Sequence, residues 1–174
     1  MGVRRAAAMS RAVLAVALAF SLGAAASTSA APTKPSHLRA YDKHLLKYVN
    51  HARVNHGLKP LRQSNRLYKV AHAWAAHMAE TETAGDDLTW TSGGQYKRVC
   101  PKATAAGAND GWQSNTSARE MFQRYKAEPY HWANILSPKY NPPGQAAYAD
   151  VGIATVKAKD GSEWNSMYFA NHCR

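Results

Sequence analysis

The chain has 174 residues, a formal net charge of +11 at pH 7 and only two cysteines. It contains no repeat, no heptad run, no second hydrophobic domain and no Cys-x-x-Cys redox motif. The positive charge fits attraction to anionic polymers or lipid headgroups, and it fits simple solubility equally well. Nothing in the sequence resembles a recognition helix or an RNA-binding motif, so nucleic acid is not an expected partner.

The first 31 residues have the pattern of a secretory signal peptide. Three arginines near the start precede an apolar run at residues 12–20, and small residues follow. The run is shorter than the ~20 residues that a membrane span needs, so no transmembrane segment is expected. Without residues 1–31 and their three arginines the charge falls from +11 to +8. Residues 32–174 are then expected to form a single domain, secreted to the extracellular side as a monomer.

Two amphipathic helices are predicted at residues 36–55 and 65–80, because apolar residues recur there at helical spacing. The expected buried faces comprise Leu38, Tyr41, Leu45, Tyr48, Val49 and Ala52 in the first, and Leu67, Val70, Ala71, Trp74, Ala75 and Met78 in the second. Residues 81–116 lack a regular pattern and are expected to be a long loop with short pieces of structure.

A third helix is predicted to begin at Ser117, where Ser-Ala-Arg-Glu forms a capping box. Pro129 should end this helix, because proline lacks the N–H and clashes with the preceding turn. Residues 151–158 and 164–170 are predicted strands, and the Asp-Gly pair between them indicates a hairpin.

Cys100 and Cys173 form an isolated, even pair. In an exported protein such a pair predicts a disulfide, and two free thiols are the weaker alternative.

Residues 117–138 resemble the bacterial branch of the CAP superfamily, whose domains are also called SCP domains. The likeness is carried by the run from Glu128 to Leu136, which reads Glu-Pro-Tyr-His-Trp-Ala-Asn-Ile-Leu. It extends to the stretches 45–61, 67–79, 151–153 and 164–170. The resemblance implies an α+β fold, an α-β-α sandwich with a small antiparallel sheet packed between helices.

In CAP proteins a central cleft commonly carries two histidines and two acidic residues, and some members bind a divalent metal there. By the resemblance, His131 matches the second histidine and Glu128 an acid found in eukaryotic members. Ala108 stands where the family's Gly-Glu-Asn motif has its carboxylate, in Gly107-Ala108-Asn109. Trp90 stands where a Phe-x-His motif has the first histidine. The binding cleft is therefore expected to contain His131, Glu128, Trp90, Ala108, Asn109 and Trp132.

One histidine and one glutamate fall short of the three or four ligands that zinc takes, so neither a metal nor another cofactor is expected. We expect His131 to be a structural residue, hydrogen-bonded to Glu128. The alternative is catalysis, in which Glu128 stabilises the cation of His131 acting as a general acid and base. No serine or cysteine nucleophile is marked out beside it.

Several aromatic residues lie in or next to the segments that form the predicted cleft: Trp90, Trp112, Tyr130 and Trp132. They would suit a lipid, a sugar ring or a hydrophobic peptide, although core packing accounts for some of them. The sequence therefore predicts an exported binding module for a cell-envelope, lipid or protein ligand. The alternative is a hydrolase or metal-dependent protease that uses His131 and Glu128.

Overall fold

A computed structural model describes residues 39–85, 87–114, 117–137 and 147–174. All of these residues belong to one compact unit, Lys34–Arg174. The predicted signal peptide and the first residues of the first predicted helix lie outside the described ranges. Within those ranges, no helix combines the length and the apolar character needed to cross a membrane.

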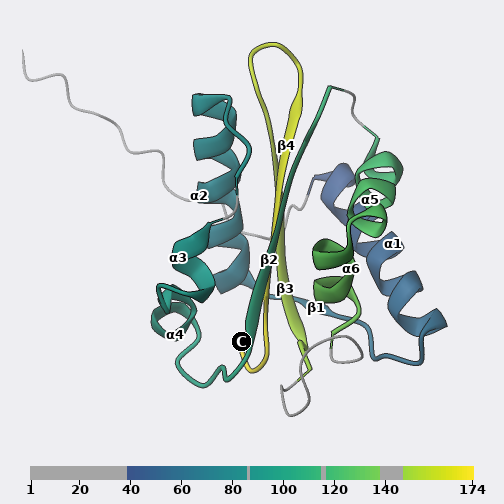
Figure 1. Ribbon diagram of the computed structural model, residues 1–174, viewed down its shortest axis with the longest axis vertical. Helices are drawn as coiled ribbons and strands as arrows, with labels where there is room; N and C mark the ends of the chain where they lie inside the picture. Colours follow the sequence, from purple (N-terminus) through teal and green to yellow (C-terminus); the bar gives the residue numbers. More distant parts are fainter. Residues whose placement is uncertain (1–38, 86, 115–116, 138–146) are drawn as a thin grey trace, which may run out of the picture. The chain divides into compact units, whose positions relative to one another are not determined.

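A four-stranded sheet with the order β1-β3-β4-β2 forms the middle layer (Figure 1). Its strands are β1 (Arg62–Gln63), β2 (Ala106–Gln113), β3 (Asp150–Lys157) and β4 (Glu163–Ala170). The predicted β3–β4 hairpin is present, and β2 pairs antiparallel with β4. The two-residue β1 pairs parallel with β3, which makes the sheet mixed.

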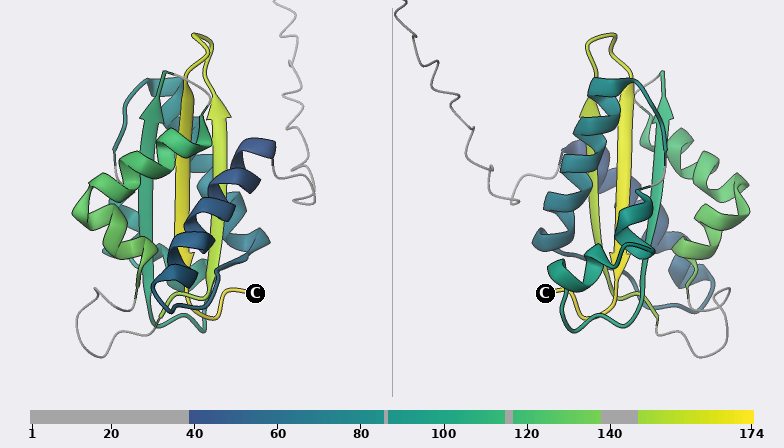
Figure 2. Two further views of the ribbon diagram at one scale, coloured as in Figure 1. Left: turned by 90° about the vertical axis from the view of Figure 1, so that its right-hand side faces the viewer. Right: turned by 60° about the vertical axis from the view of Figure 1, so that its left-hand side comes forward.

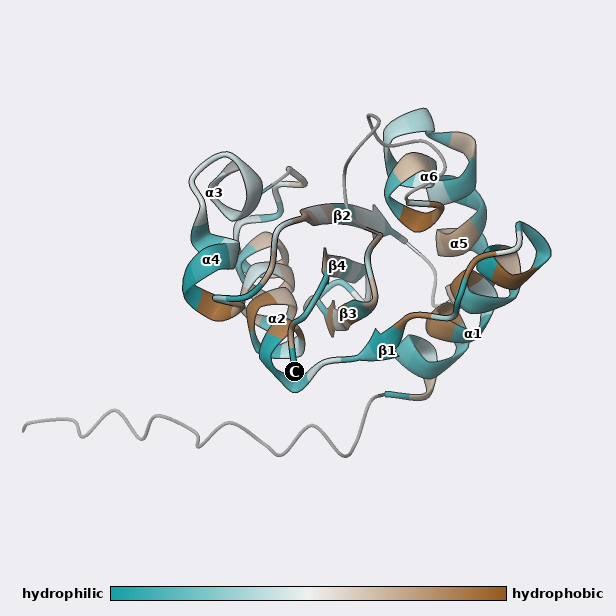
Figure 3. Ribbon diagram, turned by 90° about the horizontal axis from the view of Figure 1, so that it is seen from below, coloured by the Kyte–Doolittle hydropathy of each residue, from teal (hydrophilic) through white to brown (hydrophobic). Residues whose placement is uncertain are grey.

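Helices cover both faces of the sheet (Figures 1 and 2). One layer contains α1 (Ala40–Asn55), α5 (Ala118–Ala127) and α6 (Pro129–Ile135). The other contains α2 (Asn65–Thr81), α3 (Leu88–Thr91) and α4 (Gln95–Val99). Seen along the sheet from below, the strands again lie between these two groups (Figure 3). The predicted α-β-α sandwich is thus confirmed.

The buried face of α2 follows the predicted helical spacing at Leu67, Ala71, Ala75 and Met78, whereas Val70 and Trp74 are only partly buried. Its start is fixed by Ser64, whose hydroxyl accepts a hydrogen bond from the Leu67 N–H. The helix lies directly on β3 at Gly152, where an added Cβ would come within 2.1 Å of the Leu67 carbonyl carbon. Only glycine allows this close approach of two backbones.

The chain between α5 and α6 turns as the sequence predicts. The Ser117 side chain accepts a hydrogen bond from the Glu120 N–H at the start of α5. The helix ends at Ala127, and Pro129 is the first residue of α6, a position where its missing N–H costs nothing. His131 is therefore held on a short, separate helix.

The predicted disulfide is confirmed: Cys100 and Cys173 are bonded, with their Cα atoms 4.9 Å apart. Both cysteines are buried. The bond ties the end of α4 to the end of the chain after β4, across 73 residues of sequence.

Candidate functional site

Strand β2 lies at the edge of the sheet, where its outward backbone groups have no neighbouring strand among the described residues. Side chains from other elements bind three of its carbonyl oxygens at 2.8–2.9 Å: Tyr148 Oη donates to Ala106, Asn134 Nδ2 to Ala108 and Arg124 Nη1 to Trp112. An edge strand covered in this way is protected from pairing with other chains.

A cleft crosses this edge and has a cavity volume of about 240 Å³. Its helical residues come from α5 and α6, and Ala84, in the loop after α2, borders it from the other side of the strand. Its lining residues are Ala84, Asp110, Gly111, Trp112, Met121, Arg124, Tyr125, Glu128 and His131. We call this cavity the edge cleft.

Glu128 and His131 contact each other in the edge cleft, with Glu128 Oε2 3.2 Å from His131 Nδ1. The pairing follows from their spacing of three residues around the start of α6. The His131 side chain is 17% exposed and the Glu128 side chain 67%. The edge of the His131 ring meets the buried Tyr125 ring, with centroids 5.1 Å apart. The histidine is thus fixed on two sides but still reaches solvent.

Asn109 lies behind the cleft and joins β2 to α6. Its Nδ2 donates to the His131 carbonyl oxygen at 3.0 Å, and its Oδ1 accepts from Asn134 Nδ2 at 2.9 Å. Asn134 was not among the predicted site residues, although it stands in the resemblance motif. The two asparagines set the position of the His131 backbone, which is a structural contribution to the site.

Trp90 and Ala108 do not line the edge cleft. Trp90 is fully buried in the core between the sheet and α2, and its Nε1 donates to the Gly107 carbonyl oxygen at 3.1 Å. Ala108 packs against the same core. Successive strand residues point to opposite faces, so Ala108 and Asn109 cannot share one surface.

Trp132 also lies elsewhere, against the core on the α1 side. Its ring meets the His56 and Phe122 rings at centroid distances of 5.7 and 6.2 Å. Of the six predicted cleft residues, the structure therefore brings only Glu128 and His131 to the cavity. Their role in binding stays a prediction.

Asp110 is the carboxylate that sequence reasoning missed. It is 7% exposed and accepts hydrogen bonds from the Ser166 hydroxyl and from the Asp87 N–H. If residues 106–113 are recognised as a strand, Asp110 lies on the same face as Ala108, because the two residues are two positions apart. Because it is held by these internal partners, Asp110 builds the wall of the cleft.

The donor set of the edge cleft does not fit a zinc ion. Across the described ranges, no three histidine, cysteine or acidic side chains are placed to hold one metal. A tight zinc site needs at least three protein ligands. In the lining of the cleft, Glu128 and His131 contact each other, and the third candidate, Asp110, is held by Ser166 and the Asp87 N–H.

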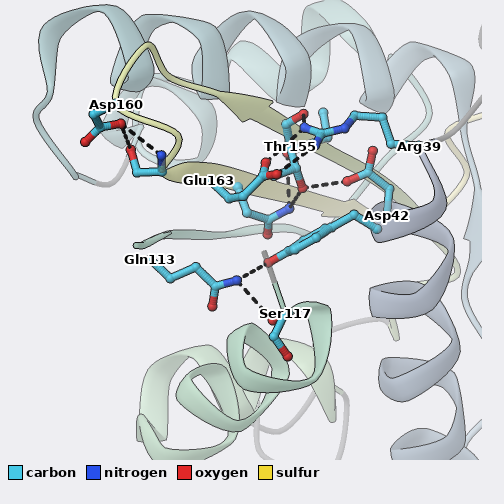
Figure 4. A network of polar contacts seen from close by, with 11 residues as sticks. Arg39, Asp42, Gln113, Ser117, Thr155, Asp160 and Glu163 are labelled. Atoms are coloured by element: carbon cyan, nitrogen blue, oxygen red, sulfur yellow. Dashed lines mark hydrogen bonds and ion pairs between the residues drawn. The ribbon is translucent and has the colours of Figure 1, made fainter. Parts of the chain in front are cut away.

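A second polar network lies at the start of α1 (Figure 4). Arg39 binds both carboxylate oxygens of Glu163, at 2.8 and 3.0 Å. Asp42 is 1% exposed, and its Oδ1 accepts from the Thr155 hydroxyl at 2.5 Å. Burial raises the pKa of Asp42 to about 7, because the charged form is poorly solvated there.

A larger cavity, of about 620 Å³, lies beside the end of α1 and the approach to β3. Its lining includes Leu58, Pro60 and Tyr148, with Lys59 and Arg62 among them.

Arg53 also borders this cavity but is 2% exposed, and its guanidinium donates to the carbonyls of Lys59, Ile135, Ser137 and Tyr148. Desolvation lowers the pKa of Arg53 to about 10. The arginine therefore ties chain segments together.

Solved structures of bacterial proteins share this fold. An outer surface protein of Borrelia burgdorferi has a TM-score of 0.58 at 16% identity, over 76% of this chain and 92% of its own. An extracellular protein of Bacillus anthracis that contains an SCP domain gives 0.58 at 18%, over 75% of this chain and 40% of its own. A cysteine-rich secretory protein of Staphylococcus aureus gives 0.56 at 17%, over 75% and 38%. The chain thus spans well under half of the last two proteins.

No curated protein sequence matches the chain. The sequence pattern of the cysteine-rich secretory protein family, CAP, matches residues 46–169, which is most of the chain and includes α2, all of β2 and the edge cleft. The chain belongs to the CAP, or cysteine-rich secretory protein, family.

Proposed function

We propose that this CAP domain is exported and acts by binding a component of the cell envelope at the edge cleft. Export is supported by the signal-like residues 1–31 and by the disulfide, since such bonds persist in oxidising compartments. The charge of +8 outside residues 1–31 would hold the protein near an anionic envelope.

The residues that line the edge cleft favour binding over catalysis. Its described lining residues include no serine, threonine or cysteine that His131 would activate. The Trp112 ring, 39% exposed, and the pair of Glu128 and His131 together offer an apolar surface beside hydrogen-bonding groups. Pockets with that combination fix the orientation of a ligand.

The alternative is hydrolysis of a peptide or ester, favoured by one observation. The contact of 3.2 Å between Glu128 and His131 is the geometry in which a carboxylate orients an imidazole as a general base. In that case water would be the nucleophile, because the described lining residues supply no side-chain hydroxyl or thiol for that role.

Sedimentation of the purified exported protein with insoluble cell-wall sacculi tests the proposal. We expect the wild type to pellet with the sacculi, and His131→Ala and Trp112→Leu to remain largely in the supernatant. Tyr130→Leu is the matched control, because Tyr130 is 87% exposed and does not line the cleft. Equal sedimentation of all four proteins would refute the edge cleft as the binding site.

The hydrolase alternative needs a separate measurement on the same proteins. Fluorescent casein and a chromogenic ester are incubated with the wild type, with and without added zinc. Turnover that disappears in His131→Ala while the variant stays folded would favour the enzyme over the binding module.

A further inference from the structure

A second cavity, of about 310 Å³, adjoins the edge cleft where α2 ends and the β3–β4 hairpin turns. Its lining residues are Glu82, Ala84, Trp112, Asp160 and Trp164. It shares Ala84 and Trp112 with the edge cleft. We call it the tryptophan cavity.

Two indole rings line the tryptophan cavity. Trp112 and Trp164 have ring centroids 5.9 Å apart and planes inclined at 49°. Trp164 is 5% exposed, whereas Trp112 is 39% exposed and is among the few large apolar side chains that the described surface leaves open. Indole has the strongest attraction of the aromatic side chains for a cation placed over its face.

Two exposed carboxylates, those of Glu82 and Asp160, also line the cavity. Asp160 Oδ1 accepts hydrogen bonds from the Ser162 N–H at 2.9 Å and the Ser162 hydroxyl at 2.6 Å (Figure 4). These bonds lower the pKa of Asp160, so it is ionised at neutral pH. Its carboxylate therefore brings negative charge to the lining of the cavity.

Glu82 has a left-handed backbone, with φ of 52°, at the residue that ends α2. Glycine is favoured at such a position because it lacks the Cβ that makes this conformation costly. A glutamate there carries a backbone cost and brings a carboxylate to the cavity.

Among the described residues, no lysine or arginine lines the tryptophan cavity, although the whole chain has a net charge of +11. We propose that this cavity binds a quaternary ammonium group, held over the indole rings and neutralised by Glu82 and Asp160. This goes beyond the proposed function, because it gives the ligand chemistry of a cavity outside the Glu128–His131 pair. The group has two possible sources, a free choline-like cation or the headgroup of a choline lipid.

The test compares choline with 3,3-dimethyl-1-butanol, which has the same shape without the charge. Binding to the purified exported protein is followed by calorimetry and by tryptophan fluorescence. We expect choline to bind about tenfold more tightly than the alcohol, since a partly desolvated cation–π contact contributes about one power of ten. Equal affinity for the two compounds, or no choline binding at 10 mM, would overturn the proposal.

Three variants separate the cavity from a general charge effect. Glu82→Gly removes a carboxylate where glycine suits the backbone, so choline affinity should fall while the melting temperature does not. Trp112→Leu should weaken choline binding at least as much as Glu82→Gly does. Glu80→Gln is the control, because it removes the same charge from an exposed residue outside the cavity. Choline affinity unchanged in both Glu82→Gly and Trp112→Leu would overturn the proposal.

Flotation with phosphatidylcholine vesicles distinguishes the two sources. Retention on the vesicles that excess free choline abolishes indicates the lipid headgroup, and choline binding without retention indicates the free cation. The sacculus assay with His131→Ala is independent of these steps. Absence of choline binding to the wild type, together with intact sacculus binding, would therefore overturn this inference alone.

Discussion

The buried carboxyl of Asp42 should make the stability of the protein depend on pH in an uncommon direction. Asp42 is 1% exposed, and its Oδ2 has no hydrogen-bond partner among the described residues. Arg39 attracts its charge, whereas Glu163 repels it and burial penalises it most. The neighbouring phenol of Tyr41 is neutral, since burial raises its pKa far above the usual range.

The sign and size follow from the two pKa values of Asp42. Its folded-state pKa is raised from 3.8 to about 7. Between these values the folded protein holds a proton that the unfolded chain has released, so stability falls as pH rises. The stabilisation is complete below pH 3.8 and is lost by about pH 7. At 1.36 kcal/mol per pH unit, the gap amounts to roughly 4 kcal/mol.

Asp42→Asn removes this titration while keeping an oxygen that accepts from the Thr155 hydroxyl. Urea unfolding of both proteins between pH 4 and pH 8 gives the difference in unfolding free energy, in which the other titrating groups largely cancel. We expect the asparagine variant to gain on the wild type as pH rises and to be the more stable one at pH 8, by up to roughly 4 kcal/mol.

Asp160→Asn is the matched control, because Asp160 is exposed and its pKa is lowered by the Ser162 hydrogen bonds. Because the pKa of Asp160 is lower in the folded than in the unfolded protein, ionised Asp160 stabilises the fold at high pH. This small stabilisation is lost as pH falls, which is the opposite sign to the effect of Asp42. A difference between wild type and Asp42→Asn that is constant across the pH range would falsify the account of Asp42.

Three further predictions concern the framework and the site. Cys100→Ser should lower the unfolding free energy by about 4 kcal/mol under oxidising conditions, because it opens a loop of 73 residues; an unchanged urea midpoint would contradict this. Gly152→Ala should cost about 3 kcal/mol or more, since its methyl group would overlap the backbone of α2, and a melting temperature within a few degrees of wild type would be the wrong result. His131→Ala should cost about 1 kcal/mol through its contact with Tyr125, whereas Glu128→Gln, at an exposed carboxylate, should cost less than about 0.5 kcal/mol in the same denaturation assay.

The helices could be predicted because they depend on the local sequence pattern, and the disulfide because the chain has only two cysteines. In α2 the apolar residues recur at helical spacing, and they are the ones that pack on the sheet. The α5–α6 turn follows from Ser117 and Pro129, whose backbone preferences act wherever they stand. The two cysteines left one possible intramolecular pairing.

Strand β2 could not be predicted in the same way, and the expectation of a long loop at residues 81–116 is wrong for residues 106–113. Its sequence, Ala-Gly-Ala-Asn-Asp-Gly-Trp-Gln, has no β-branched residue and two glycines. What makes it a strand is tertiary: its pairing with β4 on one edge and the side chains of Tyr148, Asn134 and Arg124 on the other. None of these partners is close in sequence.

The misplaced site residues have the same origin. Aligning motifs gives the position of a residue along the chain but not the face of the sheet to which it points. Once residues 106–113 are known to be a strand, alternation assigns Ala108, Asp110 and Trp112 to the α2 face and Asn109 to the α6 face. Because β2 is an edge strand, residues of both faces meet only by reaching around it. His131 does so from α6, and Glu128 from the residue that precedes this helix. The cleft is therefore a property of the edge, which a residue-by-residue comparison of motifs does not contain.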